Sequence, residues 1–266
     1  MTLPAPSIDA RALVTGASQG IGMAIARDLA KLGHNLILVA RRADILTQLA
    51  DELERKHSII AEFYPCDLAD PDQLHKLIDD IRDRNINIII NSAGIASFGP
   101  FINQDWNYET TQFALNATAV FELTHAVLPG MIRRKTGAIC NVGSAAGNIP
   151  IPNNATYVLT KAGVNAFTEA LHYELKNTGV SCTLLAPGPV RDAVIPENEK
   201  SIVDKVVPDV LWTTYESCAK ETLEAMAKNR RRVVPGPLSK AMNVVSSVAP
   251  TRVLSPVMGW FYKKMS

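Results

Sequence analysis

The feature that most constrains the fold is a regular alternation of short apolar runs with longer segments of helical spacing. The run I-N-I-I-I-N at 86–91 is apolar at four of its six positions, which is typical of a strand buried on both faces of a sheet. Similar runs predict strands at 10–16, 35–41, 59–66, 86–94, 137–142, 181–186 and 231–235. Since helical segments separate these runs, the connections are right-handed crossovers between parallel strands. The pattern predicts a doubly wound α/β domain with about seven strands and helices on both faces.

Capping residues and apolar spacing place the helices. Gly33 has the position of a C-cap glycine, and Asp70 can cap a helix that begins at Pro71. Further helices are predicted at 43–56, at 105–134 with a break near Pro129-Gly130, at 155–177 and at 213–229. No repeat or long linker interrupts the series, so residues 1–236 are predicted to form one domain, followed by a C-terminal extension at 237–266.

The bulk composition excludes several classes of protein. The chain has 266 residues, is 47% hydrophobic and carries a net charge of +1, so it gives no reason to expect nucleic acid binding. Four separated cysteines and five scattered histidines form no metal-ligand pattern. The N-terminus does not have the pattern of a signal peptide, and no apolar run reaches the ~18 residues of a transmembrane helix. We therefore expect a cytoplasmic protein in a reducing compartment that needs no metal.

The segment V-T-G-A-S-Q-G-I-G (14–22) joins the first strand to the first helix. Glycines allow the backbone to turn sharply and approach a pyrophosphate, while the helix N-terminus presents free N–H groups and a positive dipole. The glycine spacing differs from G-x-G-x-x-G, but the physical arrangement is shared. The residues predicted to hold a dinucleotide here are Gly16, Ser18, Gln19, Gly20, Ile21 and Gly22.

The end of the second strand indicates which nicotinamide cofactor binds. The strand ends in V-A-R-R, with Arg41 and Arg42 where NAD-binding chains have an acidic residue. A guanidinium can bind the 2′-phosphate of NADP in a bidentate manner, whereas a carboxylate would repel it. The sequence therefore predicts NADP(H).

A tyrosine and a lysine lie four residues apart in N-A-T-Y-V-L-T-K-A-G (154–163). On a helix, Tyr157 and Lys161 share a face. Such a pair often arises by chance on a surface, so its meaning depends on the rest of the chain. Ser144 follows the fifth strand directly, and Asn116 lies inside a helix, where an asparagine is unfavourable unless its side chain has a task.

Together these motifs resemble the short-chain dehydrogenase/reductase family, whose fold is of Rossmann type. The resemblance covers Ala10 to Gly236 and rests on T-G-A-S-Q-G-I-G, N-S-A-G (91–94), Asn116, Ser144, Y-V-L-T-K (157–161) and P-G-P-V (187–190). It implies that Tyr157 is the general acid or base and that Ser144 orients the substrate oxygen. It also implies that Lys161 binds the nicotinamide ribose and lowers the pKa of Tyr157 together with the oxidised ring. Asn116 is expected to hold a water that links Lys161 to solvent.

The resemblance implies further cofactor contacts. Asp67 corresponds to the residue that contacts the adenine. The residues expected to line the adenine-ribose side are Asn91, Ala93 and Gly94. Val190 is expected to contact the nicotinamide carboxamide through its backbone. Two positions depart from the family pattern: Asp192 stands where a threonine is usual, and Thr160 replaces a serine. The first departure lies two residues after Val190, next to the expected carboxamide contact.

The substrate is predicted from the loop at 189–212 and from the tail. The loop mixes charged and apolar residues, as a mobile lid would. After Glu224 no acidic residue occurs, and the eight positive residues are Lys228, Arg230, Arg231, Arg232, Lys240, Arg252, Lys263 and Lys264. Since Pro250 and Pro256 break apolar segments before the Trp260–Tyr262 cluster, the tail could dock on the protein or a second subunit. Alternatively, it could line a lipid cleft or contact an anionic membrane, at the inner membrane surface.

A closer resemblance favours a lipid. D-A-R-A-L-V-T-G-A-S, S-A-A-G-N-I-P-I-P-N-N-A-T-Y and R-R-V-V-P-G-P-L-S-K-A-M are similar to the mycolate reductases of mycolic-acid-producing bacteria. This implies reduction of the 3-oxo group of a long-chain mycolate precursor. The alternatives are a generic 3-oxoacyl or hydroxysteroid reductase and, from another class, a non-catalytic NADP(H)-sensing scaffold. The family resemblance also implies a homodimer or homotetramer.

Overall fold

A seven-stranded parallel sheet forms the centre of the computed structural model, which describes residues 3–191, 212–237, 239–241 and 243. The strand order is β3-β2-β1-β4-β5-β6-β9, and each neighbouring pair is parallel. The strands are β1 Arg11–Thr15, β2 Leu36–Ala40, β3 Ala61–Pro65, β4 Ile86–Asn91, β5 Gly137–Val142, β6 Val180–Leu185 and β9 Arg232–Val233. All seven predicted strands are therefore present, and the predicted fold class is confirmed.

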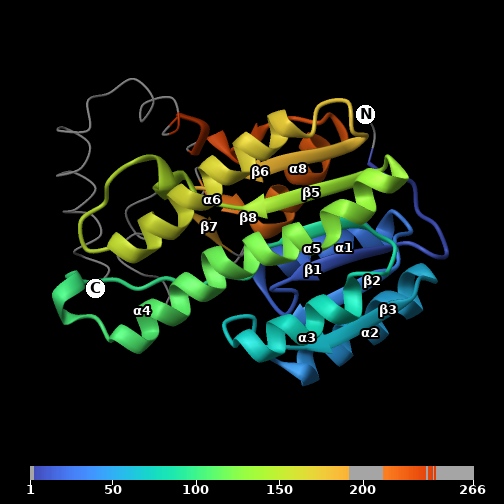
Figure 1. Cartoon of the computed structure of the whole chain (residues 1–266), viewed down its shortest axis with the longest axis horizontal. Coiled ribbons are helices and arrows are strands. Elements are labelled where there is room, and N and C mark those ends of the chain that lie inside the picture. The colour runs from blue at the N-terminus through green and yellow to red at the C-terminus, as the bar shows by residue number, and fades with distance from the viewer. Residues whose placement is uncertain (1–2, 192–211, 238, 242, 244–266) are drawn as a thin grey trace.

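Helices cover both faces of the sheet (Figure 1). They are α1 Gly20–Lys31, α2 Ala43–His57, α3 Pro71–Ile81, α4 Trp106–Phe113, α5 Ala119–Arg134, α6 Ala155–Glu174 and α8 Tyr215–Ala227. Short helical turns lie at η1 Phe101–Asn103, η2 Ala114–Thr118 and η3 Ala145–Asn148. The predicted caps are confirmed, because Gly33 has φ +85° after α1 and the Asp70 side chain accepts from the N–H groups of Asp72 and Gln73.

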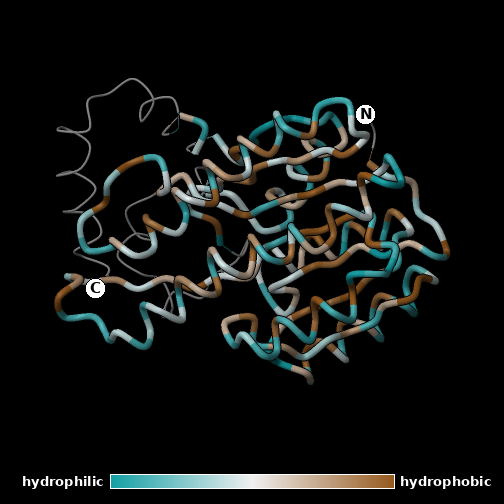
Figure 2. The backbone as a smooth tube through the Cα atoms, in the orientation of Figure 1, coloured by the Kyte–Doolittle hydropathy of each residue, from teal (hydrophilic) through white to brown (hydrophobic). Residues whose placement is uncertain are grey.

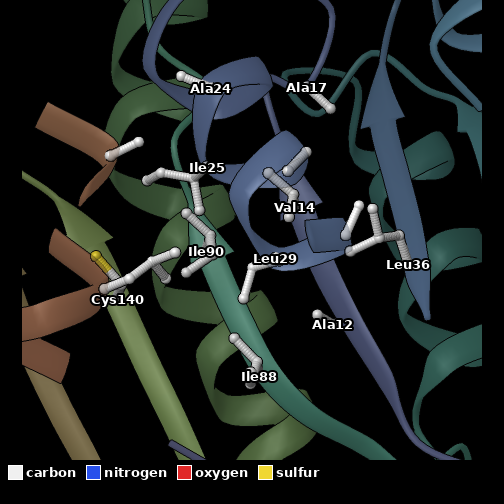
Figure 3. Packing of buried hydrophobic residues seen from close by; sticks show 14 of the residues in the cluster. Ala12, Val14, Ala17, Ala24, Ile25, Leu29, Leu36, Ile88, Ile90 and Cys140 are labelled. Atoms are coloured by element: carbon white, nitrogen blue, oxygen red, sulfur yellow. The ribbon is translucent and has the colours of Figure 1, made fainter. Parts of the chain in front are cut away.

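Two apolar cores lie on the two faces of the sheet, because successive side chains of a strand point in opposite directions. Val14 of β1 packs toward α1, α2 and α8, whereas its neighbour Leu13 packs toward α3, α5 and α6. Figure 3 shows the first core, in which Ile25 and Leu29 of α1 meet the strands. In Figure 2 hydrophobic residues lie along the strands, and hydrophobic and hydrophilic residues alternate along the helices. Each fully buried Leu or Ile stabilises the fold by about 1.5–3 kcal/mol, which fixes the register of every strand.

The break in the long helical segment is not where the sequence predicted it. The helix continues through Pro129, and the irregularity lies at η2, a π-helical turn between α4 and α5. Figure 1 shows α4 and α5 as one long rod. A proline costs a helix about 3 kcal/mol, and the burial of Val127 and Met131 beside it against the sheet offsets that cost. The π-turn contains Asn116, and such turns are frequent at functional sites.

A second small sheet pairs β7 Val190–Arg191 with β8 Thr213–Thr214; the sequence did not predict it. β7 lies at the start of the predicted substrate loop at 189–212, and β8 follows directly after its end. Asp192, the rest of that loop to residue 211 and most of the predicted extension at 237–266 lie outside the described residues. Within the part of the chain that the structure describes, none of the helices has both the length and the apolar composition to cross a bilayer.

The sheet changes direction of winding between β1 and β4, where the chain leaves to opposite sides. Thr15, the last residue of β1, connects the carboxyl ends of these two strands. Its Oγ1 accepts from the backbone N–H groups of Ser92 (2.9 Å) and Ala93 (3.1 Å) beyond β4. In doubly wound folds, ligands bind at this point of the sheet.

Candidate active site

A cavity of about 410 Å³ opens at the carboxyl edge of the sheet, between the ends of β1, β2, β3 and β4. Most of the residues predicted to bind the dinucleotide line this cavity. The lining residues are Gly16, Ser18, Gln19, Gly20, Ile21, Gly22, Ala40, Arg41, Arg42, Cys66, Asp67, Leu68, Ser92, Ala93, Gly94, Ile95, Leu115, Val142 and Tyr215.

Two glycines of the turn after β1 are required by close backbone approaches. Gly16 has φ +66°, and a Cβ there would lie 2.9 Å from the backbone nitrogen of Ala93. A Cβ on Gly22 would lie 2.5 Å from the carbonyl oxygen of Gly16. No side chain fits at either position, so the turn keeps bare backbone facing the cavity at the N-terminus of α1.

The two arginines after β2 differ in their contacts. Arg42 lies across the turn, where its guanidinium donates to the Oγ of Ser18 (3.0 Å), the carbonyl of Ser18 (3.2 Å) and the Oε1 of Gln19 (2.6 Å). The Arg41 side chain is exposed beside it and also lines the cavity. The rim of the cavity at the end of β2 is therefore cationic.

Three predicted cofactor residues take different places. Asp67 lines the cavity. Asn91 does not: its buried side chain donates to Asn141 Oδ1 (2.8 Å) and Thr124 Oγ1 (3.1 Å) and so ties β4 to β5 and α5. Val190 forms β7 and is not among the lining residues. Direct cofactor contacts of Asn91 and Val190 therefore stay predictions.

One face of α6 meets the carboxyl end of β5, whose arrowhead points toward the start of that helix in Figure 1. The Ser144 hydroxyl is near enough to the Tyr157 hydroxyl to lower its pKa as a hydrogen-bond partner. The Lys161 ammonium donates to the carbonyl of Val142 (2.8 Å) and lies 5.8 Å from the centre of the Tyr157 ring. The structure thus brings together the serine, the tyrosine and the lysine that the sequence singled out.

Asn116 joins this group from the π-turn. Its amide clamps the backbone of Ile95, because Nδ2 donates to the carbonyl (2.8 Å) and Oδ1 accepts from the N–H (2.9 Å). A Cβ on Gly94 would lie 3.1 Å from Asn116 Oδ1 and 3.5 Å from Lys161 Nζ. Gly94 also lines the cavity, so the side chains of Asn116 and Lys161 lie next to the cavity at this glycine.

Thr160, the residue that departs from the family's serine, also takes part. Its hydroxyl donates to the carbonyl of Tyr157 (2.9 Å) and accepts from Asn116 Nδ2 (3.3 Å). The extra methyl group therefore leaves the hydroxyl contacts in place.

Burial dominates the electrostatics of the group. It raises the pKa of Tyr157 above its usual value of 10.0, with the Ser144 hydrogen bond acting in the opposite direction. It also lowers the pKa of Lys161 from 10.5 to about 8. In the chain alone, desolvation of the phenolate dominates and the pKa of Tyr157 is not lowered. The expected lowering by Lys161 together with the oxidised ring stays a prediction.

Sequence reasoning missed several lining residues. Ala40, Cys66 and Val142 stand at or directly after strand ends, so the rule that ligands bind at the carboxyl edge could have found them. Tyr215 could not be found in this way. It begins α8, and its ring reaches the turn after β1, 3.6 Å from where a Gly20 Cβ would lie.

The described residues contain no group of His, Cys, Asp or Glu that could hold a metal ion. The four cysteines are free and buried.

Comparison with known proteins shows which family and which reductases this chain is similar to. The family model described as short chain dehydrogenase matches residues 10–201. The ketoacyl reductase HetN of Nostoc sp. is 31% identical over 257 residues, which cover 94% of this chain and 88% of that protein. The very-long-chain 3-oxoacyl-CoA reductase of Bos taurus is 34% identical over 180 residues, 66% of this chain and 58% of that protein. The match therefore spans less than two thirds of the bovine protein.

Among solved structures, a short-chain dehydrogenase from Sphingobium yanoikuyae in complex with NADPH is similar over the whole fold. The TM-score is 0.77 at 29% sequence identity, and the match covers 92% of this chain and 94% of that chain.

The buried ammonium generates a stability prediction. Below about pH 8, Lys161 is charged and buried in the folded chain, whereas water solvates the same charge in the unfolded chain. This burial lowers the free energy of unfolding, and the loss disappears as the pH rises toward 10.5 and the group becomes neutral in both states. A shift of this size corresponds to about 3 kcal/mol, of which the lost bond to Val142 returns about 1 kcal/mol. We expect Lys161→Met to raise the free energy of unfolding by about 2 kcal/mol at pH 7, with the gain shrinking toward pH 10.5.

Urea unfolding of both proteins at pH 7 and pH 10 measures this difference, in which the titration of other groups cancels. Lys31→Met is the matched control, because its side chain is 62% exposed; its effect should stay within about 0.5 kcal/mol at both pH values. A Lys161→Met protein that is less stable than the parent at pH 7 would contradict the buried charge.

Proposed function

Because the chain belongs to the short-chain dehydrogenase family, we propose that it is an NADP(H)-dependent reductase that converts a ketone into a secondary alcohol. The observation that carries the proposal is the Lys161 ammonium, which is bound to the carbonyl of Val142 and lies 5.8 Å from the centre of the Tyr157 ring, with the Ser144 hydroxyl acting on the phenol. The substrate class that fits best is a 3-oxoacyl compound.

The cavity suits a dinucleotide phosphate. Bare backbone at Gly16 and Gly22 can accept a pyrophosphate, and the rim formed by Arg41 and Arg42 can pair with a 2′-phosphate. When bound, NADPH would supply the hydride. The remaining task for the chain is to orient the ketone and deliver a proton.

In the proposed reaction, the Tyr157 hydroxyl donates its proton to the carbonyl oxygen as the hydride reaches the carbon. Ser144 Oγ accepts from the N–H of Ala146 (3.1 Å), so the serine hydrogen faces Tyr157, whose pKa it lowers, and would turn to the substrate oxygen when the ketone binds. A high pKa keeps Tyr157 protonated at neutral pH, as a general acid must be. The proton is replaced through Lys161 and, by way of Asn116, from solvent.

The first test removes the proton donor. Tyr157→Phe keeps the ring and deletes only the hydroxyl, so turnover should fall by at least about a thousandfold while NADPH binding changes less than about threefold. Steady-state rates and fluorescence titration with NADPH measure the two effects. Near-normal turnover of the variant would remove Tyr157 from the mechanism.

Measurements on the parent chain also address the other class of function. If the chain binds NADPH tightly but turns over none of a panel of ketones, the non-catalytic scaffold becomes the better reading.

The second test concerns the cofactor. Arg42→Ala should lower kcat/KM for NADPH by about tenfold or more and leave kcat/KM for NADH within about twofold. Arg55→Ala on α2 is the matched control, since its Nε donates only within its own helix, to the carbonyl of Asp51. Equal losses with both cofactors would show that Arg42 only supports the turn.

For the substrate, we propose a long-chain 3-oxoacyl compound, with the mycolate precursor as the specific candidate. Two relatives are named as reductases of ketoacyl or 3-oxoacyl compounds. The loop before α6 bonds to the loop after β4, where Asn154 Nδ2 donates to the carbonyl of Ser97. Exposed apolar side chains follow that loop, namely Phe101, Ile102 and Trp106, and Figure 2 shows a short hydrophobic stretch there beside a hydrophilic one.

The chain-length profile tests this proposal. We expect kcat/KM with NADPH to rise by at least about tenfold from a C4 to a C16 3-oxoacyl-CoA, because added methylenes bury apolar surface. A flat profile with good turnover of steroid ketones would favour the hydroxysteroid alternative. In a bacterium that makes mycolic acids, loss of the gene should cause 3-oxo mycolates to accumulate only if the specific candidate is right.

The tail, the subunit arrangement and the location belong to the same proposal. We propose a cytoplasmic homodimer or homotetramer whose basic C-terminal segment contacts an anionic membrane surface near its substrate. The support is the charge of the sequence after Glu224 and attraction of such segments to anionic lipid.

A further inference from the structure

One side chain holds the backbone of Ser144 from two directions. Asn165 on α6 accepts from the N–H of Ser144 through Oδ1 (3.3 Å) and donates to the carbonyl of Ser144 through Nδ2 (2.9 Å). Both contacts come from a single planar amide, which is buried at 4% exposure. The peptide groups on both sides of Ser144 are thereby fixed to α6, the helix that carries Tyr157.

The sequence of the turn fits this amide. A Cβ on Gly147 would lie 2.7 Å from Asn165 Nδ2, and a Cβ on Gly143 would overlap Asn165 Oδ1. The glycines in G-S-A-A-G therefore leave the room that Asn165 occupies, and Asn165 lies one helical turn beyond Lys161 on the same face.

Asn165 is itself held by a longer network. Its Nδ2 also donates to Asn148 Oδ1 (3.1 Å), and that oxygen accepts from Arg232 Nη2 of β9 (3.3 Å). Asn148 Nδ2 donates to Asn243 Oδ1 (3.4 Å), which also accepts from Arg232 Nη1 (3.2 Å). Arg232 is anchored by an ion pair with Glu169 of α6 (2.9 Å). The network reaches from the last strand and the C-terminal segment to Ser144.

We propose that Asn165 is a positioning residue that keeps Ser144 Oγ in register with Tyr157, and that Asn148 connects it to Arg232 and Asn243. The inference rests on the proposed function, because it acts through Ser144. The hydroxyl of Ser144 must face both Tyr157 and the substrate oxygen, and small displacements of reacting groups cost large factors in rate. Asn165 touches neither the substrate nor the cofactor in this scheme.

The experiment is a double-mutant cycle. Single-turnover reduction of a C16 3-oxoacyl-CoA by NADPH is measured for Asn165→Ala in the parent and in a Ser144→Ala background, at enzyme concentrations that resolve small rates. Asn165→Ala should lower the rate by about 10- to 100-fold in the parent and by less than about twofold in the Ser144→Ala background. The NADPH Kd should change less than about threefold.

Asn35→Ala is the matched control. Asn35 is a buried asparagine that also clamps backbone, donating to the carbonyls of Ser7 and Ile8 and accepting from the N–H of Ile60, but it lies before β2 at the opposite edge of the sheet. It should lower stability and leave the rate unchanged. A comparable rate loss in Asn35→Ala would show that Asn165 acts through general stability.

A second variant keeps the inference testable if Asn165→Ala does not fold. Asn148→Ala leaves both Ser144 contacts in place and frees Asn165 to move, so a smaller rate loss is expected, which again disappears in the Ser144→Ala background. Equal fold-losses in both backgrounds would overturn the inference while the proposed function stands. If Ser144→Ala alone keeps the parent rate, the proposed role of Ser144 fails, and the role of Asn165 fails with it.

Discussion

The site depends on the burial of one ammonium group against the end of a β-strand. Lys161 donates to the carbonyl of Val142 at the end of β5, and this contact ties α6 to the sheet. The same helix face presents Tyr157 on one side of Lys161 and Asn165 on the other, so the three side chains are positioned together. Burial destabilises the charged form of Lys161. This ammonium group lies at the point where the cavity opens.

The fold could be predicted because its signals are local and repeated. The apolar runs indicate strands, Gly33 indicates the end of a helix, and Asp70 indicates the start of another. Each of these signals depends only on nearby residues. Pro129 misled the prediction, because the local cost of a proline was outweighed by packing that only the assembled sheet provides. The π-turn at Asn116 has no local signature beyond the unfavourable asparagine itself.

The site was predictable in part for a related reason. Tyr157 and Lys161 are four apart on one helix, and Ser144 follows a strand, so the topology alone brings them to one edge. Arg42 was predicted to face a phosphate, but its contacts with Ser18 and Gln19 depend on the folded turn. Asn165 looks like an ordinary helical residue in the sequence, and only the position of Gly143 and Gly147 against it reveals its task.

The electrostatics could not be derived from the motif at all. A neighbouring lysine suggests an acidic phenol, yet burial raises the pKa of Tyr157 in the chain alone. A lowered value then requires additional positive charge, which oxidised cofactor would bring to the cavity. The most direct measurement is the ionisation of Tyr157, taken as the ultraviolet difference titration between parent and Tyr157→Phe, with and without NADP⁺. The account predicts a midpoint above pH 10 for the free chain and a fall of at least about one unit when NADP⁺ is bound. A midpoint below pH 10 in the free chain, or one that NADP⁺ leaves unchanged, would contradict it.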